Sequence, residues 1–255
     1  ILAQAEHSAM STEVDRTLVS IAFDASASAT EAYETLLDRG ADPNARDVAD
    51  TPVLHAAVSR RDHGLATLLL HRRADVNLTN PAGDSALHLA ARHGHSGVVS
   101  LLCREADVDL NLKNASGYAP MHVAAFNGCT AAIQRLVSSG ADIDIARSSA
   151  DGPTPLICAA EQDHEEACDR LAVLKADLDT LAAATGRNAI MAAVERGSDA
   201  ALRSLLRSGA DPTICSPVDG LSALTMAERC GTSTARRLVA AYGRRPDPKV
   251  SRLFG

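Results

Sequence analysis

Apolar residues occur along this chain in two kinds of short segment, which alternate with polar turns. Leu87, Ala90 and Ala91 are spaced as on one face of a helix, and Val98 and Leu102 follow after a Gly-His step. Spacings of three and four residues predict short amphipathic helices, and the intervening glycine marks the end of the first helix. The pattern therefore predicts a chain built from pairs of short helices.

The helix pairs recur with a fixed period, because two kinds of mark repeat along the chain. One mark is a glycine in the polar turn, found at Gly83, Gly117, Gly152, Gly186 and Gly220, at steps of 34 or 35 residues. The other is an Ala-Asp pair that begins at positions 41, 74, 106, 141, 176 and 210. Two interleaved series with one period indicate a tandem-repeat protein, whose units stack because no single unit buries its own apolar face.

The motif between these marks resembles the ankyrin repeat, whose signature is Thr-Pro-Leu-His. Thr154, Pro155 and Leu156 match it in one unit, and Pro120 and His122 match it in the unit before. The resemblance implies an all-α ankyrin-repeat solenoid of about seven helix-turn-helix units joined by β-hairpin-like turns. The units are expected at residues 15–46, 47–79, 80–113, 114–148, 149–182, 183–216 and 217–243, after an N-terminal extension (1–14) and before a basic C-terminal tail (244–255).

The motif also has a physical basis that is independent of the family. Thr154 before Pro155 is a helix N-cap followed by proline at the first helical position, where the missing N–H costs nothing. Ala159 and Ala160 then place small side chains on one face, which lets a second helix approach closely. The first unit lacks the motif and is interpreted as an N-terminal cap.

Composition and charge exclude several classes of protein. The 255 residues carry a net charge of −7, which argues against a general nucleic-acid binder, since those need basic surfaces. No uncharged apolar run reaches the roughly 18 residues of a membrane span. Only 2% of the residues are aromatic, so the core is expected to close over small side chains. The basic tail is left with alternative interpretations, a solvated end or a contact with nucleic acid, anionic lipid or an acidic protein.

The six cysteines show no Cys-x-x-Cys motif and no regular spacing. We interpret them as reduced thiols, which predicts an intracellular, cytoplasmic protein. Cys103 and Cys158 fall in apolar helix positions and are expected to be core residues, as free cysteines usually are.

Residues that could carry chemistry are interpreted as structural. The resemblance implies that His88 and His122 hydrogen-bond the backbone of neighbouring units. His93 and His95 lack a third ligand at a zinc-like spacing, so no metal site is expected. The sequence contains no nucleophile elbow, phosphate-binding loop or HExxH motif. The chain is therefore predicted to be no enzyme and to use no cofactor and no small-molecule substrate.

The resemblance also implies where a protein partner would bind, because ankyrin solenoids use their turn tips and the residues after the Ala-Ala pair. Two of the six aromatic residues, Tyr118 and Phe126, fall on such positions in one central unit. The alternative is that Tyr118 only packs on Phe126. Further candidates at equivalent positions are Arg92, His93, Asn127, Glu161, Arg187 and Arg196.

The turn before the sixth unit is unusual, because Leu181 stands where such tips are normally polar. Either another subunit covers this tip, which makes Leu181 a further binding candidate, or the tip folds back onto the neighbouring turn.

These observations lead to a primary functional hypothesis and two alternatives. The primary one is a non-catalytic protein–protein interaction module, an adaptor or scaffold, that is monomeric by itself. The first alternative is a structural subunit of a large multi-protein assembly. The second is the targeting domain of an enzyme whose catalytic part lies outside this sequence.

Overall fold

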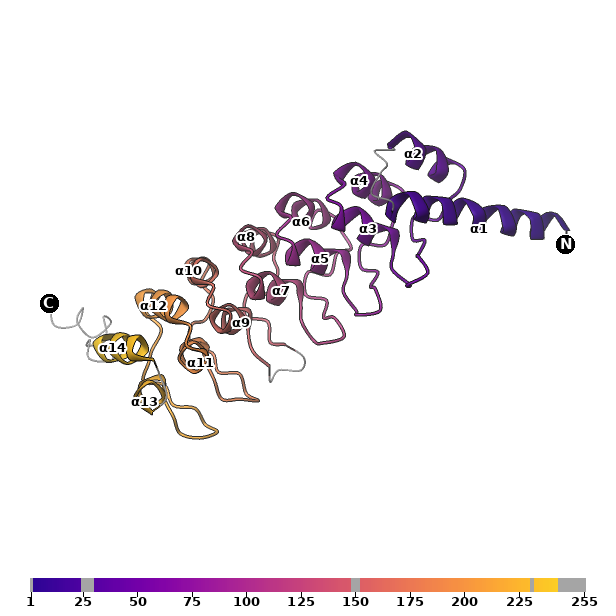
Figure 1. Ribbon diagram of the computed structural model, residues 1–255. Helices are drawn as coiled ribbons and strands as arrows, with labels where there is room; N and C mark the ends of the chain where they lie inside the picture. Colours follow the sequence, from indigo (N-terminus) through magenta and orange to yellow (C-terminus); the bar gives the residue numbers. More distant parts are fainter. Residues whose placement is uncertain (1, 24–29, 148–151, 230–231, 243–255) are drawn as a thin grey trace.

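The computed structural model describes residues 2–23, 30–147, 152–229 and 232–242, and in this part of the chain it contains seven pairs of helices. Figure 1 shows the pairs in one row, with the first helix of each pair in one layer and the second helix in the other. Hairpin turns project from the layer of first helices. The predicted all-α solenoid of about seven units is therefore confirmed.

The first helices are α1 (Leu2–Phe23), α3 (Val53–Ser59), α5 (Ala86–Arg92), α7 (Pro120–Phe126), α9 (Pro155–Glu161), α11 (Ala189–Arg196) and α13 (Ala223–Arg229). The second helices are α2 (Thr30–Asp38), α4 (His63–His71), α6 (Ser96–Leu102), α8 (Thr130–Ser138), α10 (Glu165–Val173), α12 (Asp199–Ser208) and α14 (Ser233–Tyr242).

Helix α1 begins at Leu2, so residues 2–14 form one continuous helix with the start of the expected first unit. The sequence has no glycine or proline between Leu2 and Phe23, and both are the residues that most disfavour a helix interior. The basic tail, residues 244–255, lies outside the described residues.

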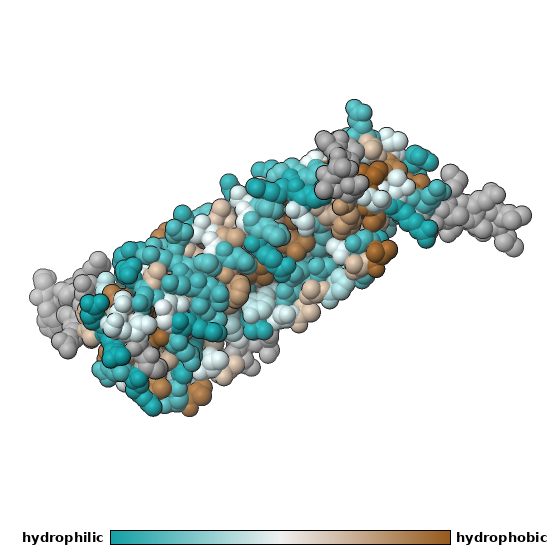
Figure 2. Space-filling model, in the orientation of Figure 1, coloured by the Kyte–Doolittle hydropathy of each residue, from teal (hydrophilic) through white to brown (hydrophobic). Residues whose placement is uncertain are grey.

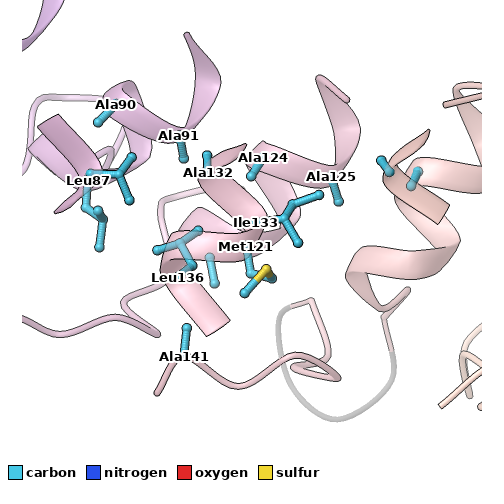
Figure 3. Packing of buried hydrophobic residues seen from close by; sticks show 14 of the residues in the cluster. Leu87, Ala90, Ala91, Met121, Ala124, Ala125, Ala132, Ile133, Leu136 and Ala141 are labelled. Carbon is cyan, nitrogen blue, oxygen red and sulfur yellow. The ribbon is translucent and has the colours of Figure 1, made fainter. Parts of the chain in front are cut away.

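The core between the layers is built from small side chains, as the low aromatic content predicts. Ala90, Ala91, Ala124 and Ala125 are fully buried, and Figure 3 shows them between the helices with Ile133 and its neighbours. Alanine on the facing surfaces lets successive first helices pack closely, and leucine, isoleucine and methionine fill the space toward the second helices. The result is one continuous apolar core along the described repeats.

The hairpin turns carry short antiparallel bridges at Arg46–Pro52, Thr79–Ser85, Ala182–Arg187 and Cys215–Ser222. Gly83 has a φ of +74°, and a Cβ at this position would collide with the backbone of Ala115 and Asn114 in the next turn. Glycine is therefore required there by both conformation and space. The turn before the second unit adopts the same left-handed conformation with Asp50, at φ +58°.

Buried histidines join neighbouring units, and this confirms the prediction for His88 and His122. Nδ1 of His88 accepts the Ser85 N–H at 3.1 Å, and Nδ1 of His122 accepts the Ala119 N–H at 3.2 Å. The proton is then on Nε2, which donates to the carbonyl of Tyr118 at 2.9 Å or of Pro153 at 3.0 Å in the following turn. Each imidazole thus ties its own helix start to the next unit.

The second unit contains an incomplete version of this link. Nε2 of His55 donates to the Asp84 carbonyl at 2.8 Å, but its Nδ1 has no hydrogen-bond partner. The reason is that Pro52 occupies the N-cap position and has no N–H to donate. The one-residue displacement of this proline along the motif therefore leaves a buried nitrogen unpaired.

Five cysteines lie in the described part of the chain, and all five are free thiols. Burial raises the pKa of Cys158 and Cys168 to about 12, so both thiols stay protonated and unreactive near neutral pH. Cys158 is a core residue, as predicted, and Cys103 is half-buried against the core.

Candidate functional site

The candidate site is a groove of about 300 Å³ in the two central units, between the ends of α5 and α7 and the turn that precedes α7. The structure brings four of the predicted partner-binding residues together there. The groove is lined by Arg92, Asn114, Ser116, Tyr118, Val123, Phe126 and Asn127. Phe126 is the last residue of α7 and keeps 42% of its surface exposed, although aromatic side chains are usually buried.

The side chains of Asn114 and His88 hydrogen-bond to the backbone of Tyr118. Oδ1 of Asn114 accepts the N–H groups of Ser116 and Tyr118, both at 3.0 Å, and so closes the turn. The carbonyl of Tyr118 accepts the proton of His88 at 2.9 Å. The buried histidine link therefore also fixes the wall of the groove.

The ring of Tyr118 is fixed by two further contacts. The guanidinium of Arg147 lies over the ring, 4.2 Å from its centroid, and the ring of His122 meets it edge-on with centroids 5.9 Å apart. Nε of Arg147 also donates to the Ser116 carbonyl at 3.0 Å. These contacts leave Tyr118 half-buried and pre-oriented, so a partner would bind it with little loss of side-chain freedom.

Arg92 is anchored by a buried carboxylate. Its Nη2 lies 2.6 Å from Oδ2 of Asp84, whose side chain is only 3% exposed, and Nδ2 of Asn114 donates to the other carboxylate oxygen at 2.7 Å. The Arg92 side chain keeps 42% of its surface exposed. Among the described residues no carboxylate lines the groove itself, whereas Arg92 lines it and Arg147 lies beside it, so a partner meets the exposed side of a guanidinium there.

Comparison with known proteins decides the family. A family model of ankyrin repeats matches residues 54–147 and 145–216. The chain belongs to the ankyrin-repeat family. A solved structure of the ankyrin repeat domain of Bcl-3, a member of the IkappaB protein family, is similar in fold. It has a TM-score of 0.75 and 22% sequence identity, and the match covers 89% of this chain and 97% of that one.

Two curated plant proteins share short stretches with this ankyrin chain. The E3 ubiquitin-protein ligase KEG of Arabidopsis thaliana is 37% identical over 67 residues, which are 26% of this chain and 4% of that protein. The probable E3 ubiquitin-protein ligase XBOS33 of Oryza sativa subsp. japonica is 47% identical over 49 residues, 19% of this chain and 9% of that protein. The chain thus spans a small part of these relatives. Ankyrin repeats are protein-interaction modules, and the ankyrin fold is generally non-catalytic.

Three other predicted candidates lie near the groove or farther along the same ankyrin face. His93 is exposed at the end of α5, and its ring is stacked on His95 with centroids 5.3 Å apart. Glu161 at the end of α9 is half-buried, and Arg196 at the end of α11 is exposed. The series changes from positive at Arg92 through aromatic at Phe126 to negative at Glu161.

Arg187 is engaged within the ankyrin fold. Its Nη1 and Nη2 bind the two carboxylate oxygens of Asp219 in the next turn, at 3.1 and 2.9 Å, and its Nε lies 3.5 Å from Glu195. Only 17% of its side chain is exposed. The structure therefore gives Arg187 an inter-repeat role that the sequence pattern did not reveal, because the partner carboxylate lies one repeat farther along the chain.

Leu181 packs partly against its own chain. Its side chain is partly buried against the core, next to Ala182, which is 3% exposed. The Ala182–Arg187 bridge and the bond from the Gly186 N–H to the Ala182 carbonyl, at 2.7 Å, turn the hairpin back at this point. This packing agrees with a tip that folds back, and contact of Leu181 with a partner stays a prediction.

The sequence pattern missed Phe23, which ends α1 and is 40% exposed. It follows the buried Ala22 as Phe126 follows Ala125, and that Ala-Phe step is the signal that could have identified it. The first unit lacks the Thr-Pro-Leu-His motif, so the alignment of its first helix with the others is hidden in the sequence.

In the part of the ankyrin chain that the structure describes, no group of three or more His, Cys, Asp or Glu side chains is arranged to hold a metal ion. None of the helices in the described segments is long and apolar enough to cross a membrane. Figure 2 shows apolar residues on the visible face as small separate patches among polar ones.

Proposed function

We propose that this ankyrin-repeat domain is a non-catalytic adaptor or scaffold that binds a protein partner through the groove at Tyr118 and Phe126 and the adjoining turn tips. The observation that carries the proposal is that four residues chosen from repeat position alone, Arg92, Tyr118, Phe126 and Asn127, line one half-open groove. Tyrosine and arginine are enriched among the residues that dominate binding energies, and such residues cluster in partly preformed pockets.

The groove suits a protein partner for a second reason. Its aromatic and cationic groups are already held in place by His88, Arg147 and Asp84, so association costs little ordering of side chains. His93, Glu161 and Arg196 extend the face on both sides and would contribute rim contacts, which affect association rate more than final affinity.

The test is affinity capture from cells that express the chain, comparing the wild type with the variant that combines Tyr118→Ala and Phe126→Ala. The proposal expects specific partners to be retained by the wild type and lost from the double variant. Val173→Ala is the matched control, because Val173 is also exposed, at 69%, but lies at the end of α10 in the other helix layer. Partners that remain on a folded double variant would show that binding uses another surface.

A structural role in a permanent assembly remains the first alternative, and it makes a different prediction. In size-exclusion of a native lysate, a permanent subunit elutes only with its complex, whereas an adaptor also elutes at the mass of its own chain alone. For either role we propose a cytoplasmic location, supported by the free thiols, which cell fractionation tests directly.

Recruitment of substrates for an enzyme is the second alternative, and the similarity to two ubiquitin ligases supports it. In that case the captured proteins carry ubiquitin and accumulate when ubiquitination is blocked. Captured partners without ubiquitin, at unchanged levels, favour the adaptor.

A further inference from the structure

A second groove lies at the N-terminal end of the solenoid, between α1 and the first hairpin turn. Its volume is about 600 Å³, and its lining includes the apolar side chains of Val19, Phe23, Ala45 and Val48. Phe23 is 40% exposed and Val48 is fully exposed. Large apolar side chains that are exposed next to one another often mark an interaction site.

Three of the four charged side chains that line this second groove are engaged within the chain. Oδ1 of Asp15 accepts the Asp42 N–H at 2.7 Å, and Oδ1 of Asp47 accepts two N–H groups of its own turn. Arg46 donates to the carbonyls of Asp50 and Thr79, both at 2.9 Å. The fourth, Arg16, is exposed, so the second groove offers a partner an apolar surface with one exposed cation at its edge.

The two grooves have the same construction. Each places an exposed phenylalanine at the last residue of a first helix, Phe23 in α1 and Phe126 in α7, opposite a side chain of a hairpin turn, Val48 or Tyr118. The first helices between them, α3 and α5, end at Ser59 and Arg92, which are exposed as well. The two phenylalanines are thus equivalent positions, three units apart.

The spacing of the grooves follows from helix packing. Helices α1, α3, α5 and α7 contact one another in order, and packed helices lie about 8–10 Å apart. Three steps place the two phenylalanines about 24–30 Å apart, which an extended peptide spans with about seven to nine residues at 3.3 Å each. A segment on this path passes the end of α5 about one helix spacing before Phe126.

The charged side chain that this path meets at the end of α5 is a cation. Arg92 is paired from inside with the buried Asp84 but keeps 42% of its side chain exposed, Arg147 flanks Tyr118, and none of the described residues that line this groove is a carboxylate. The chain as a whole carries a net charge of −7. An acidic side chain of a partner would be attracted here and repelled over much of the remaining surface.

We propose that the occupant of both grooves is one extended segment of a partner protein. It carries two large apolar side chains about seven to nine residues apart and an acidic side chain within about three residues of the one that binds at Phe126. This inference rests on the proposed function and adds the chemistry of the partner, namely two apolar anchors and one carboxylate between them.

The test uses random peptides about twice that length, displayed on phage and selected on the full chain. Peptides that also bind the variant combining Tyr118→Ala and Phe126→Ala are removed. The proposal expects the enriched peptides to share the two apolar positions and the acidic one. Phe23→Ala and Phe126→Ala should each weaken a selected synthetic peptide about tenfold or more, and Val173→Ala should leave its affinity unchanged.

Replacing the acidic residue of that peptide by its amide tests the charge without disturbing the Arg92–Asp84 pair. It should weaken binding and reduce the dependence of affinity on salt. Thermal unfolding of each protein variant confirms that the domain is intact.

Other outcomes separate this inference from the proposed function. If Phe126→Ala weakens the peptides and Phe23→Ala does not, the two-groove inference is overturned and binding at the central groove stands. If enriched peptides are basic, or if none is enriched, the inference is also overturned, and the capture experiment decides the function independently. If every peptide that binds the wild type also binds the double variant, so that none survives the removal step, both ideas are contradicted.

Discussion

The third and fourth units differ from the sixth and seventh in how neighbours are joined, although the helices are arranged alike. In the former, His88 and His122 are fully buried and bond the next turn. In the latter, Met191 and Thr225 occupy the histidine positions. There, the Arg187–Asp219 pair joins the two turns at the surface. One architecture thus tolerates two different linkages, a neutral buried one and a charged, partly exposed one.

The difference matters for function because the candidate groove lies where the histidine links are consecutive. His88 holds the carbonyl of Tyr118, and His122 contacts its ring. The stability of this groove wall therefore depends on both imidazoles remaining neutral. In the C-terminal units, Asn188 caps α11 through the Met191 N–H at 3.0 Å and no imidazole is present at that position.

The largest expected effect is a loss of stability in acid that begins in the histidine-linked units. Burial lowers the pKa of His122 from 6.5 to about 4, and it lowers the pKa of His55 and His88 as well; Lys113 and Arg147 add to the effect at His122. The unfolded chain binds these protons at higher pH than the folded chain. Stability is therefore complete above about pH 6.5 and falls as the pH approaches 4, by up to about 3 kcal/mol for His122 alone.

Urea unfolding at about pH 7 and about pH 5 measures this loss, and hydrogen exchange locates it. Amide protection should fall first in the second to fourth units. Equal unfolding free energies at the two pH values, or an earlier loss in the sixth and seventh units, would show that the histidines do not control the difference.

The second effect comes from converting one kind of unit into the other by His122→Met, which copies the side chain of Met191. It removes the donor to the Pro153 carbonyl and the acceptor for the Ala119 N–H, which should cost about 2–3 kcal/mol of unfolding free energy at neutral pH. The acid sensitivity should decrease at the same time. A variant that loses stability but keeps the wild-type pH dependence would contradict this account.

A smaller effect is expected from Arg187→Ala. Arg187 holds the pKa of Asp219 down at about 2 by donating two hydrogen bonds, but the pair is at the surface, where ion pairs contribute little and salt screens them. The unfolding midpoint should decrease slightly in low salt, and the difference from the wild type should shrink in high salt. His122→Met is the contrast, because its cost should hardly change with salt.

The smallest expected effect is an increase in the free energy of unfolding. Pro52→Ser supplies an N–H for the unpaired Nδ1 of His55, as Ser85 does for His88 at 3.1 Å. The new hydrogen bond is worth about 1 kcal/mol, partly offset by the greater freedom of the unfolded chain without proline. Denaturant unfolding should show a modest stabilisation. A destabilised variant would mean that the proline ring contributes more than the missing bond.

Most of the fold could be predicted from the sequence, because each repeat is fixed by local chemistry. The N-cap and proline of Thr154 and Pro155, the alanine pairs and the turn glycines act within a few residues of themselves. The histidine links followed from the family resemblance and the helical register. Tyr118 and Phe126 were predictable as neighbours of one face because repeat position determines which way a side chain points.

Two features were missed, the Arg187–Asp219 pair and the exposed Phe23. Nothing near Arg187 in the sequence indicates Asp219, which lies one repeat farther along the chain. For Leu181 the sequence left two alternatives open, because its direction depends on how its hairpin bends at Ala182. Phe23 was missed because the first unit replaces the motif with a long helix, so the sequence gives no register for it.

The most direct test of the account is a hydrogen-exchange footprint of the chain with and without a captured partner. The account predicts added protection at residues 114–118 and at the ends of α5 and α7, with smaller changes at the end of α1. The second helices α4, α6, α8, α10 and α12 should be unaffected. Protection confined to the second helices, with none at the turn of Tyr118, would contradict the claim that this groove is the binding site.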